Sequence, residues 1–352
     1  MYLVLIGFCF ILNFLTKKPY KKICFQISFL ILFVFSALRY QYGSDYNSYY
    51  TFFHHVKEGY GNLEIEEIGF YFINKIFPSF YLMVAVLSGI FLAFIYKLVI
   101  SHLEVEEYKY ALFIFLVDPY LFLMSLSMMR QAFAIVLFGM AIYFARQKKY
   151  VYYILICLLA TTIHTSAIIL IPFVFVANTN KGILTEPKWM IPIVIILFGF
   201  SATLLTPVIE WGLRQFNDSN YIYYYRTTAT NTLRATILSI IPLLYLLLNI
   251  SNLEDDRLVY SKMSIFSYIT DILAYSFGMI GRFGYYFSFF KIIALPAIFM
   301  YKYRNSRGID RIINVYIFPT IIVVIYLLRL YSFFTNPLWK SFIDYKTILD
   351  LL

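Results

Sequence analysis

The chain has 352 residues, of which 61% are hydrophobic and only 14% are charged. Soluble domains usually contain about 45–50% apolar and about 25% charged residues, so a water-soluble fold of this length could not hide so much apolar surface. The net charge of +10 does not indicate nucleic-acid binding, because the basic residues do not form one stripe beside exposed aromatic residues. The composition therefore predicts a single integral membrane domain over residues 1–352.

Signatures of soluble enzymes and of metal sites are absent from the sequence. The three cysteines, Cys9, Cys24 and Cys157, lie in apolar stretches and lack the spacing of metal ligands. There is no phosphate-binding loop, no dinucleotide-binding motif and no metalloprotease motif. We therefore expect no disulfide, no metal site and no cofactor.

Apolar stretches follow one another along the whole chain. The first begins at Tyr2 without a preceding basic region, which is typical of a membrane anchor rather than of a cleavable signal peptide. A bilayer crossing takes about 17–25 mostly apolar residues, so these stretches predict an all-α, polytopic helical bundle with about 10–12 crossings. The predicted spans are 2–16, 23–38, 79–100, 109–126, 130–146, 150–177, 189–209, 235–250, 258–276, 283–301 and 311–334.

The basic residues predict the orientation, because cytoplasmic loops carry an excess of Lys and Arg. The cluster Lys17–Lys22 places the loop after the first span inside, and the cluster Lys302–Arg311 places a loop near the end of the chain inside. Alternating crossings then put the two long loops, 39–78 and 210–234, outside.

Counting crossings from the two ends gives a conflict at the stretch 150–177. Both of its ends are expected in the cytoplasm, so it cannot be one simple crossing. We therefore predict a re-entrant helix or a tight helical hairpin that turns near His164, where protein or water must satisfy the non-helical backbone. The alternative is an error of one span elsewhere, for instance in the closely joined pair 109–126 and 130–146.

Ionisable residues at or inside the membrane cost about 2.5–3.5 kcal/mol on insertion scales, which makes them functional candidates. Arg39 follows the span 23–38, and its guanidinium can contact phosphate oxygens in pairs. Gly43 permits a turn that other residues make only at a cost. Asp45 can orient the guanidinium or accept a proton from a sugar hydroxyl, and Tyr46 can stack on a sugar ring. The alternative for Arg39 is a helix-end residue that snorkels beside an aromatic belt.

Arg130 and Gln131 begin the span 130–146 on the same predicted side as Arg39. A cation at a helix N-terminus opposes the helix dipole, and a bound anion such as phosphate would resolve that conflict. The alternative is an interfacial anchor.

His164 and Ser166 lie at the predicted break. A histidine in apolar surroundings is more often structural, but a break would place His164 beside a polar cavity.

Further charged residues lie in the second half of the chain. Arg282 begins the span 283–301 on the outer side, and Arg226 adds charge to the tyrosine-rich loop 210–234. Lys291 and Asp271 lie deeper in neighbouring spans, and we expect them to form a structural ion pair.

Three short motifs occur in a set order along the chain. They are the Arg39-to-Tyr49 segment with its Gly43-Ser44-Asp45-Tyr46 core, Arg130-Gln131 followed by small and apolar residues, and His164-Thr165-Ser166-Ala167. In order and spacing they resemble the EpsG family of membrane proteins, relatives of the Wzy-type polysaccharide polymerases. The similarity runs over most of the chain, but beyond about residue 200 only the general layout matches, with Arg282 and Asn336-Pro337.

The resemblance implies a polymerase of exopolysaccharide or capsule that joins repeat units carried on undecaprenyl diphosphate at the outer face of the plasma membrane. Neither a nucleotide sugar nor a metal is required. On this hypothesis Arg39, Arg130 and Arg282 neutralise the diphosphate leaving group, and His164 or Asp45 deprotonates the acceptor hydroxyl; we favour His164. The residues expected to contact sugar or other parts of the substrate are Gly43, Tyr46, Gln131, Ser166 and Arg226.

The expected partners are the undecaprenyl-diphosphate-linked oligosaccharide, membrane lipid, a chain-length regulator and a flippase protein. Three other functions remain open. A lipid-linked oligosaccharide flippase usually shows two related halves and charges along its path, and the sequence has no internal repeat. A membrane acyltransferase of the same pathway would present a catalytic histidine to a cytoplasmic acyl donor. The third is a non-catalytic assembly subunit.

Overall fold

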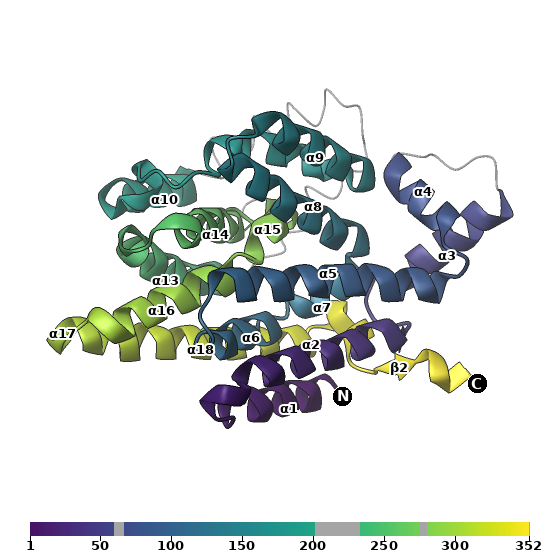
Figure 1. Cartoon of the computed structure of the whole chain (residues 1–352), viewed down its shortest axis with the longest axis horizontal. Coiled ribbons are helices and arrows are strands. Elements are labelled where there is room, and N and C mark those ends of the chain that lie inside the picture. The colour runs from purple at the N-terminus through teal and green to yellow at the C-terminus, as the bar shows by residue number, and fades with distance from the viewer. Residues whose placement is uncertain (60–66, 201–232, 275–279, 352) are drawn as a thin grey trace. The chain divides into compact units, whose positions relative to one another are not determined.

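The computed structural model describes residues 1–59, 67–200, 233–274 and 280–351, which are helical almost throughout (Figure 1). The all-α polytopic architecture expected from the sequence is confirmed. The chain divides into two compact units, Met1–Asn178 with Tyr326–Leu352, and Thr179–Ile325. Each unit is described by itself, so the single membrane domain stays a prediction.

The first unit contains most of the residues singled out in the sequence. Its α-helices are α1 (Tyr2–Phe14), α2 (Lys21–Leu38), α3 (Tyr46–Glu58), α4 (Ile68–Ile76), α5 (Phe80–His102), α6 (Tyr108–Val117), α7 (Phe122–Ser127), α8 (Met129–Arg146) and α9 (Tyr150–Ile163). Its 3₁₀ helices are η1 (Lys18–Tyr20), η2 (Thr165–Phe175), η7 (Pro337–Phe342) and η8 (Ile348–Leu351). Two short strands, β1 (Arg39–Tyr40) and β2 (Lys346–Thr347), pair antiparallel, with Arg39 opposite Thr347 and Tyr40 opposite Lys346.

The second unit is also helical in its described part. Its elements are η3 (Ile183–Thr185), α10 (Pro187–Phe200), α13 (Leu233–Asn249), η5 (Ile250–Asn252), α14 (Asp255–Leu273), α15 (Ile280–Ser288), α16 (Lys291–Asn305), α17 (Gly308–Arg311), the π-helix η6 (Ile312–Ile317) and the first part of α18 (Phe318–Thr335). The remainder of α18, from Tyr326, belongs to the first unit.

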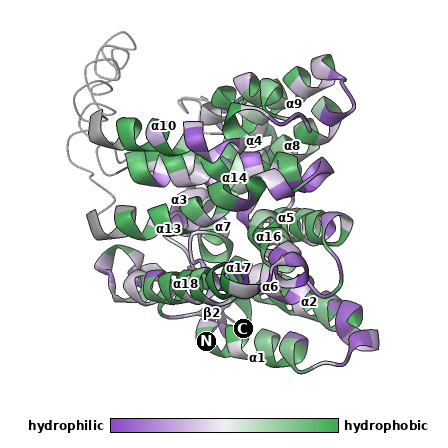
Figure 2. Ribbon diagram, turned by 90° about the vertical axis from the view of Figure 1, so that its left-hand side faces the viewer, coloured by the Kyte–Doolittle hydropathy of each residue, from purple (hydrophilic) through white to green (hydrophobic). Residues whose placement is uncertain are grey.

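Hydrophobic residues dominate most helices (Figure 2). Within the described residues, four helical stretches are long and apolar enough to cross a membrane: Lys18–Leu38, Phe80–His102, Met129–Arg146 and Gly308–Thr335. A fifth candidate is the pair α15 and α16, bent by 56°. Six shorter apolar helices overlap the predicted spans 2–16, 109–126, 150–177, 189–209 and 235–250, and the number of crossings stays a prediction.

The predicted break in the stretch 150–177 is confirmed. Helix α9 ends at Ile163, and His164 has an extended backbone, with φ −149° and ψ 111°. The chain then folds back, because the hydroxyl of Tyr153 on α9 donates a hydrogen bond to the carbonyl of Leu170 on η2 at 2.5 Å. The two elements therefore form a helical hairpin that turns at His164.

Two spans that the sequence suggests are continuous are broken as well. The stretch 109–126 divides into α6 and α7 at Asp118, whose backbone is extended, with ψ 103°. Pro119 explains this break, because a proline disfavours the helical conformation of the residue before it. The stretch 283–301 bends between α15 and α16. Apolar length alone did not reveal these breaks.

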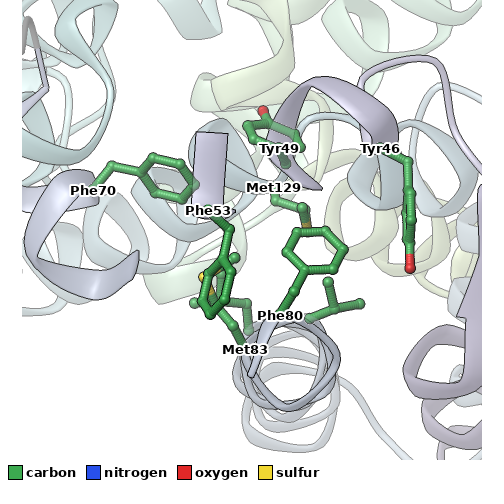
Figure 3. Packing of buried hydrophobic residues seen from close by; sticks show 9 residues of the cluster. Tyr46, Tyr49, Phe53, Phe70, Phe80, Met83 and Met129 are labelled. Carbon is green, nitrogen blue, oxygen red and sulfur yellow. The ribbon is translucent and has the colours of Figure 1, made fainter. Parts of the chain in front are cut away.

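The outer loop predicted at 39–78 is largely helical in its described part. Its helices α3 and α4 pack against each other and bury aromatic side chains against α5 and α8. Figure 3 shows this cluster from close by. Its buried members are Tyr46, Tyr49, Phe53, Phe70, Phe80, Met83, Val84, Leu87 and Met129. The cluster fixes the two loop helices beside the first turn of α8. The loop predicted at 210–234 lies almost entirely outside the described residues.

Candidate functional site

A polar cluster in the first unit is centred on Glu67, the residue before α4. Its Oε2 lies 2.6 Å from a terminal guanidinium nitrogen of Arg130. Its Oε1 lies 2.7 Å from Nδ1 of His164 and accepts a hydrogen bond from the backbone N–H of Thr165 at 3.0 Å. We refer to Glu67, Arg130, His164 and Thr165 as the Glu67 cluster. One carboxylate thus joins the starts of α4, α8 and η2.

The local structure explains why these side chains meet. Arg130 lies in the first turn of α8, and the break after α9 turns His164 and Thr165 toward α4. Gly69 lets α4 approach the end of α9 closely: a Cβ at this position would lie 2.7 Å from Cδ1 of Ile163 and 3.0 Å from the carbonyl oxygen of Thr162. Any larger residue at position 69 would push the two helices apart.

The three side chains that the carboxylate brings together differ in exposure. The side chain of Glu67 is 9% exposed, that of His164 26% and that of Arg130 40%. Burial pushes the pKa of Glu67 up, but the hydrogen bond from His164 and the positive charge of Arg130 outweigh it and hold this pKa below its ordinary value. Glu67 is therefore a buried carboxylate anion, while its two partners reach the surface.

Aromatic rings orient the guanidinium of Arg130. Its central carbon lies 5.4 Å from the ring centre of Tyr49 and 5.7 Å from that of Phe70. Both rings belong to the buried cluster of Figure 3. Such cation–π contacts are worth about 0.5–2 kcal/mol each. Arg130 is thus fixed by a carboxylate at one end and by aromatic faces at its side, and part of it remains accessible.

The Gly43–Asp45 turn is hydrogen-bonded to Ser127, the last residue of α7, which lies two positions before α8. The backbone N–H of Asp45 donates to Oγ of Ser127, and Ser127 donates back to the carboxylate of Asp45, both at 3.1 Å. Gly43 has a φ of +114°, and a Cβ there would lie 3.2 Å from Cα of Ser127. Both the conformation and the close approach require glycine. Together with the contact of Arg130 with the ring of Tyr49, these bonds bring the first two motifs of the sequence together in space.

Arg39 lies in different surroundings from Arg130. Its side chain is 1% exposed and donates hydrogen bonds to the carbonyl of Ser36, to Oγ of Ser88 at 2.8 Å and to the carbonyl of Leu126 at 3.3 Å. The neighbouring cavity, partly lined by these same residues, has a volume of about 10 Å³, room for about one water molecule. The expectation that Arg39 faces a diphosphate in a void shared with Arg130 does not fit this placement.

Two of the residues expected to contact sugar belong to the core. The ring of Tyr46 is fully buried, and its hydroxyl donates to the carbonyl of Arg39 at 3.2 Å. Gln131 is 2% exposed within α8. An aromatic residue cannot stack on a ligand while both of its faces are packed, so a sugar contact does not fit the placement of Tyr46. Ser166 is half-buried in η2, two residues beyond His164.

The remaining candidates lie in the second unit or outside the described residues. Arg282 is exposed in α15, which belongs to the second unit, whereas Arg39 and Arg130 belong to the first. Arg226 lies outside the described residues. Lys291 and Asp271 form the expected ion pair, with Nζ 3.6 Å from Oδ2.

Sequence reasoning missed Glu67 as a site residue. The conflict between Arg130 and the dipole of its helix did predict an anion at the start of α8. We assigned that anion to a substrate phosphate, whereas the chain itself supplies a carboxylate. Sequence distance hides the link, because Glu67 lies 63 residues from Arg130 and 97 residues from His164.

The cluster combines two chemical capacities. An imidazole held at Nδ1 by a carboxylate can accept a proton at its other nitrogen, and a part-exposed guanidinium can bind an anion. Within the described residues no group of three or more His, Cys, Asp or Glu side chains could hold a metal ion. The imidazole and the guanidinium together are suited to proton transfer beside a bound anion.

A model of the EpsG family matches residues 22–347, a range that includes the whole Glu67 cluster. No curated protein and no solved structure shows significant similarity to the chain.

Proposed function

The chain belongs to the EpsG family, and on that premise we propose that this multi-pass membrane polysaccharide polymerase joins oligosaccharide repeat units carried on undecaprenyl diphosphate. The reaction takes place at the outer face of the plasma membrane. A hydroxyl of the acceptor unit attacks the anomeric carbon of the donor glycan. The bond from that carbon to the diphosphate oxygen breaks, and the lipid diphosphate leaves with the electron pair.

The Glu67 cluster supplies the two groups that this reaction needs. His164 takes the proton of the attacking hydroxyl, which can contribute about 10²–10⁴-fold to the rate. Arg130 offers its accessible donors to the diphosphate, whose charge grows as the bond breaks. The observation that carries the proposal is that a single carboxylate, Glu67, holds the base and the cation from separate helices at one point.

Other residues act around this pair in our proposal. Asp45, fixed by Ser127 close to the start of α8, orients the sugar. For Arg282, exposed in α15 of the second unit, the proposal is binding to an anionic part of the donor. Arg39 acts from within the fold, because its guanidinium ties the end of α2 to α5 and α7 and thereby places the turn that carries Asp45.

The test is polymerisation by the purified protein in lipid nanodiscs, supplied with lipid-linked repeat units. We expect the wild type to form polymer, and Arg130→Ala and His164→Ala each to lower the rate at least about 10²-fold. Arg282→Ala should weaken donor binding. The matched controls are Arg307→Ala and His55→Ala, which remove the same side-chain types from exposed positions.

Two results would refute the proposal. One is an unchanged rate for correctly folded Arg130→Ala or His164→Ala protein. The other is a wild-type protein that moves lipid-linked units across the bilayer without joining them, which would identify a flippase.

A further inference from the structure

We infer that Glu67 is a positioning residue with two roles. It fixes the tautomer of His164, so that Nε2 is the nitrogen that accepts the proton. It also holds the guanidinium of Arg130 at a fixed position relative to that imidazole. This inference rests on the proposed function and assigns a role to a residue outside the three motifs. It follows from the geometry of one carboxylate with two differently engaged oxygens.

The oxygen that faces His164 dictates where the ring proton lies. Oε1 of Glu67 is 2.7 Å from Nδ1, a hydrogen-bond distance, and an ionised carboxylate can only accept. Nδ1 must therefore carry the proton, and in the neutral ring the lone pair is at Nε2. Among the described residues, the hydrogen bond of the His164 ring engages Nδ1, and Nε2 has no partner. The nitrogen that can act as a base is thus also the one left available.

The second oxygen links the base to the cation. Oε2 binds Arg130 at 2.6 Å, while Oε1 also accepts from the backbone of Thr165 at 3.0 Å. The Thr165 contact anchors the carboxylate to the hairpin that carries His164, and the Arg130 contact anchors it to α8. A shift of the Glu67 carboxylate would therefore move both the imidazole of His164 and the guanidinium of Arg130.

The pattern of burial separates this role from that of an ordinary surface ion pair. Glu67 is the most buried of the three side chains, at 9%, and the partners on either side of it are more exposed, at 26% and 40%. The carboxylate is thus largely buried, while the imidazole and the guanidinium that it holds each keep exposed surface. A charge that only stabilised the fold would not need to leave both partners accessible.

The decisive measurement is the ¹⁵N NMR spectrum of protein labelled at its histidine rings, in nanodiscs and without substrate. The chain has four histidines, and the His164→Gln spectrum identifies the signals of His164. At a pH at which the imidazole is neutral, the spectrum of the wild type should show a protonated Nδ1 and an unprotonated Nε2. Glu67→Gln removes the obligate acceptor, since its amide can also donate, and should shift the ring toward the Nε2-protonated tautomer.

Activity supplies the second readout. Glu67→Gln should lower the rate of polymerisation about 10²-fold or more, mainly through kcat, because a ring in the wrong tautomer cannot accept the proton. Glu67→Asp keeps an acceptor and should retain the wild-type tautomer with intermediate activity. The matched control is Glu58→Gln, at the exposed end of α3, which should change neither readout.

The outcomes separate this inference from the proposed function. A tautomer of His164 that is the same in wild type and in folded Glu67→Gln would overturn the role of Glu67, whatever the enzyme does. The tautomer can also shift as expected in a protein that makes no polymer even as wild type. That result would support the role of Glu67 in fixing the tautomer of His164 and would refute the proposed polymerase activity.

Discussion

Gly69 shows how one residue without a side chain can position charged groups elsewhere. It lies two residues after Glu67, and its Cα faces the last turn of α9 so closely that a Cβ would contact both Thr162 and Ile163. The close approach brings the carboxylate to His164. A residue that carries no chemistry is thereby required for the geometry of those that do.

Gly69→Ala should therefore separate α4 from α9. Overpacking of this kind typically costs about 1–3 kcal/mol, and the distance between Glu67 and His164 should grow. We expect a lower thermal unfolding temperature, a tautomer of His164 shifted as in Glu67→Gln, and a lower polymerisation rate.

Gly7→Ala is the matched control, since nothing lies within 4 Å of a Cβ added there in α1. In a helix, alanine is favoured over glycine by about 0.5–1 kcal/mol, so this variant should be as stable as the wild type or slightly more stable. Equal behaviour of the two variants would mean that the close approach at Gly69 does not position Glu67.

At the scale of elements, the C-terminal segment holds the Arg39–Asp45 region in place. Strand β2 pairs with β1, and the hydroxyl of Tyr345 donates to the carbonyl of Phe35 at 2.7 Å while the two rings stack at 4.1 Å. Ser341 contacts the turn as well: its carbonyl accepts from the N–H of Gly43 at 3.4 Å. A segment about 300 residues away thus fixes the glycine turn.

Tyr345→Ala should loosen this contact. We expect a loss of about 0.5–3 kcal/mol of stability and faster proteolytic cleavage near the Gly43 turn, together with reduced polymerisation through the misplaced Asp45. Tyr331→Ala, which removes a ring that is 68% exposed on α18, is the control and should leave the turn protected. Cleavage at the wild-type rate in Tyr345→Ala would show that β1 and its turn hold their place without the C-terminal segment.

The helix breaks at His164 and Asp118 differ in how clearly the sequence predicts them. The break at His164 was predictable from the positive-inside rule, because a crossing with two cytoplasmic ends cannot be simple. The break at Asp118 had a local signal in Pro119, but the apolar residues around it obscured that signal. What no local pattern indicated is the ion pair that fills the break, in which Asp118 lies 3.6 Å from Arg329 on α18.

At the scale of the whole molecule, the orientation in the membrane can be tested with introduced cysteines. The natural cysteines are buried and can be replaced. A cysteine at Ser44, in the exposed turn, should react with a membrane-impermeant maleimide in intact cells. A cysteine at Lys148, in the exposed basic loop after α8, should react only after the cells are opened.

The reverse labelling pattern, or labelling of both positions from one side, would contradict an outward-facing site. Either result would be inconsistent with polymerisation at the outer face. In the first case the turn that carries Asp45 would face the cytoplasm, and in the second the turn and the basic loop after α8 would lie on the same side.

The sequence by itself determined the membrane class, the helical architecture, the family and the hairpin at His164. Each of these depends on composition, on the length of apolar stretches or on short motifs, which are properties of neighbouring residues. Only the tertiary structure decided that Arg39 is buried and that Glu67 joins Arg130 to His164. The partners of a charged side chain are set by packing between distant segments, and in the low-dielectric interior a carboxylate, a carbonyl or a phosphate can each satisfy the same guanidinium.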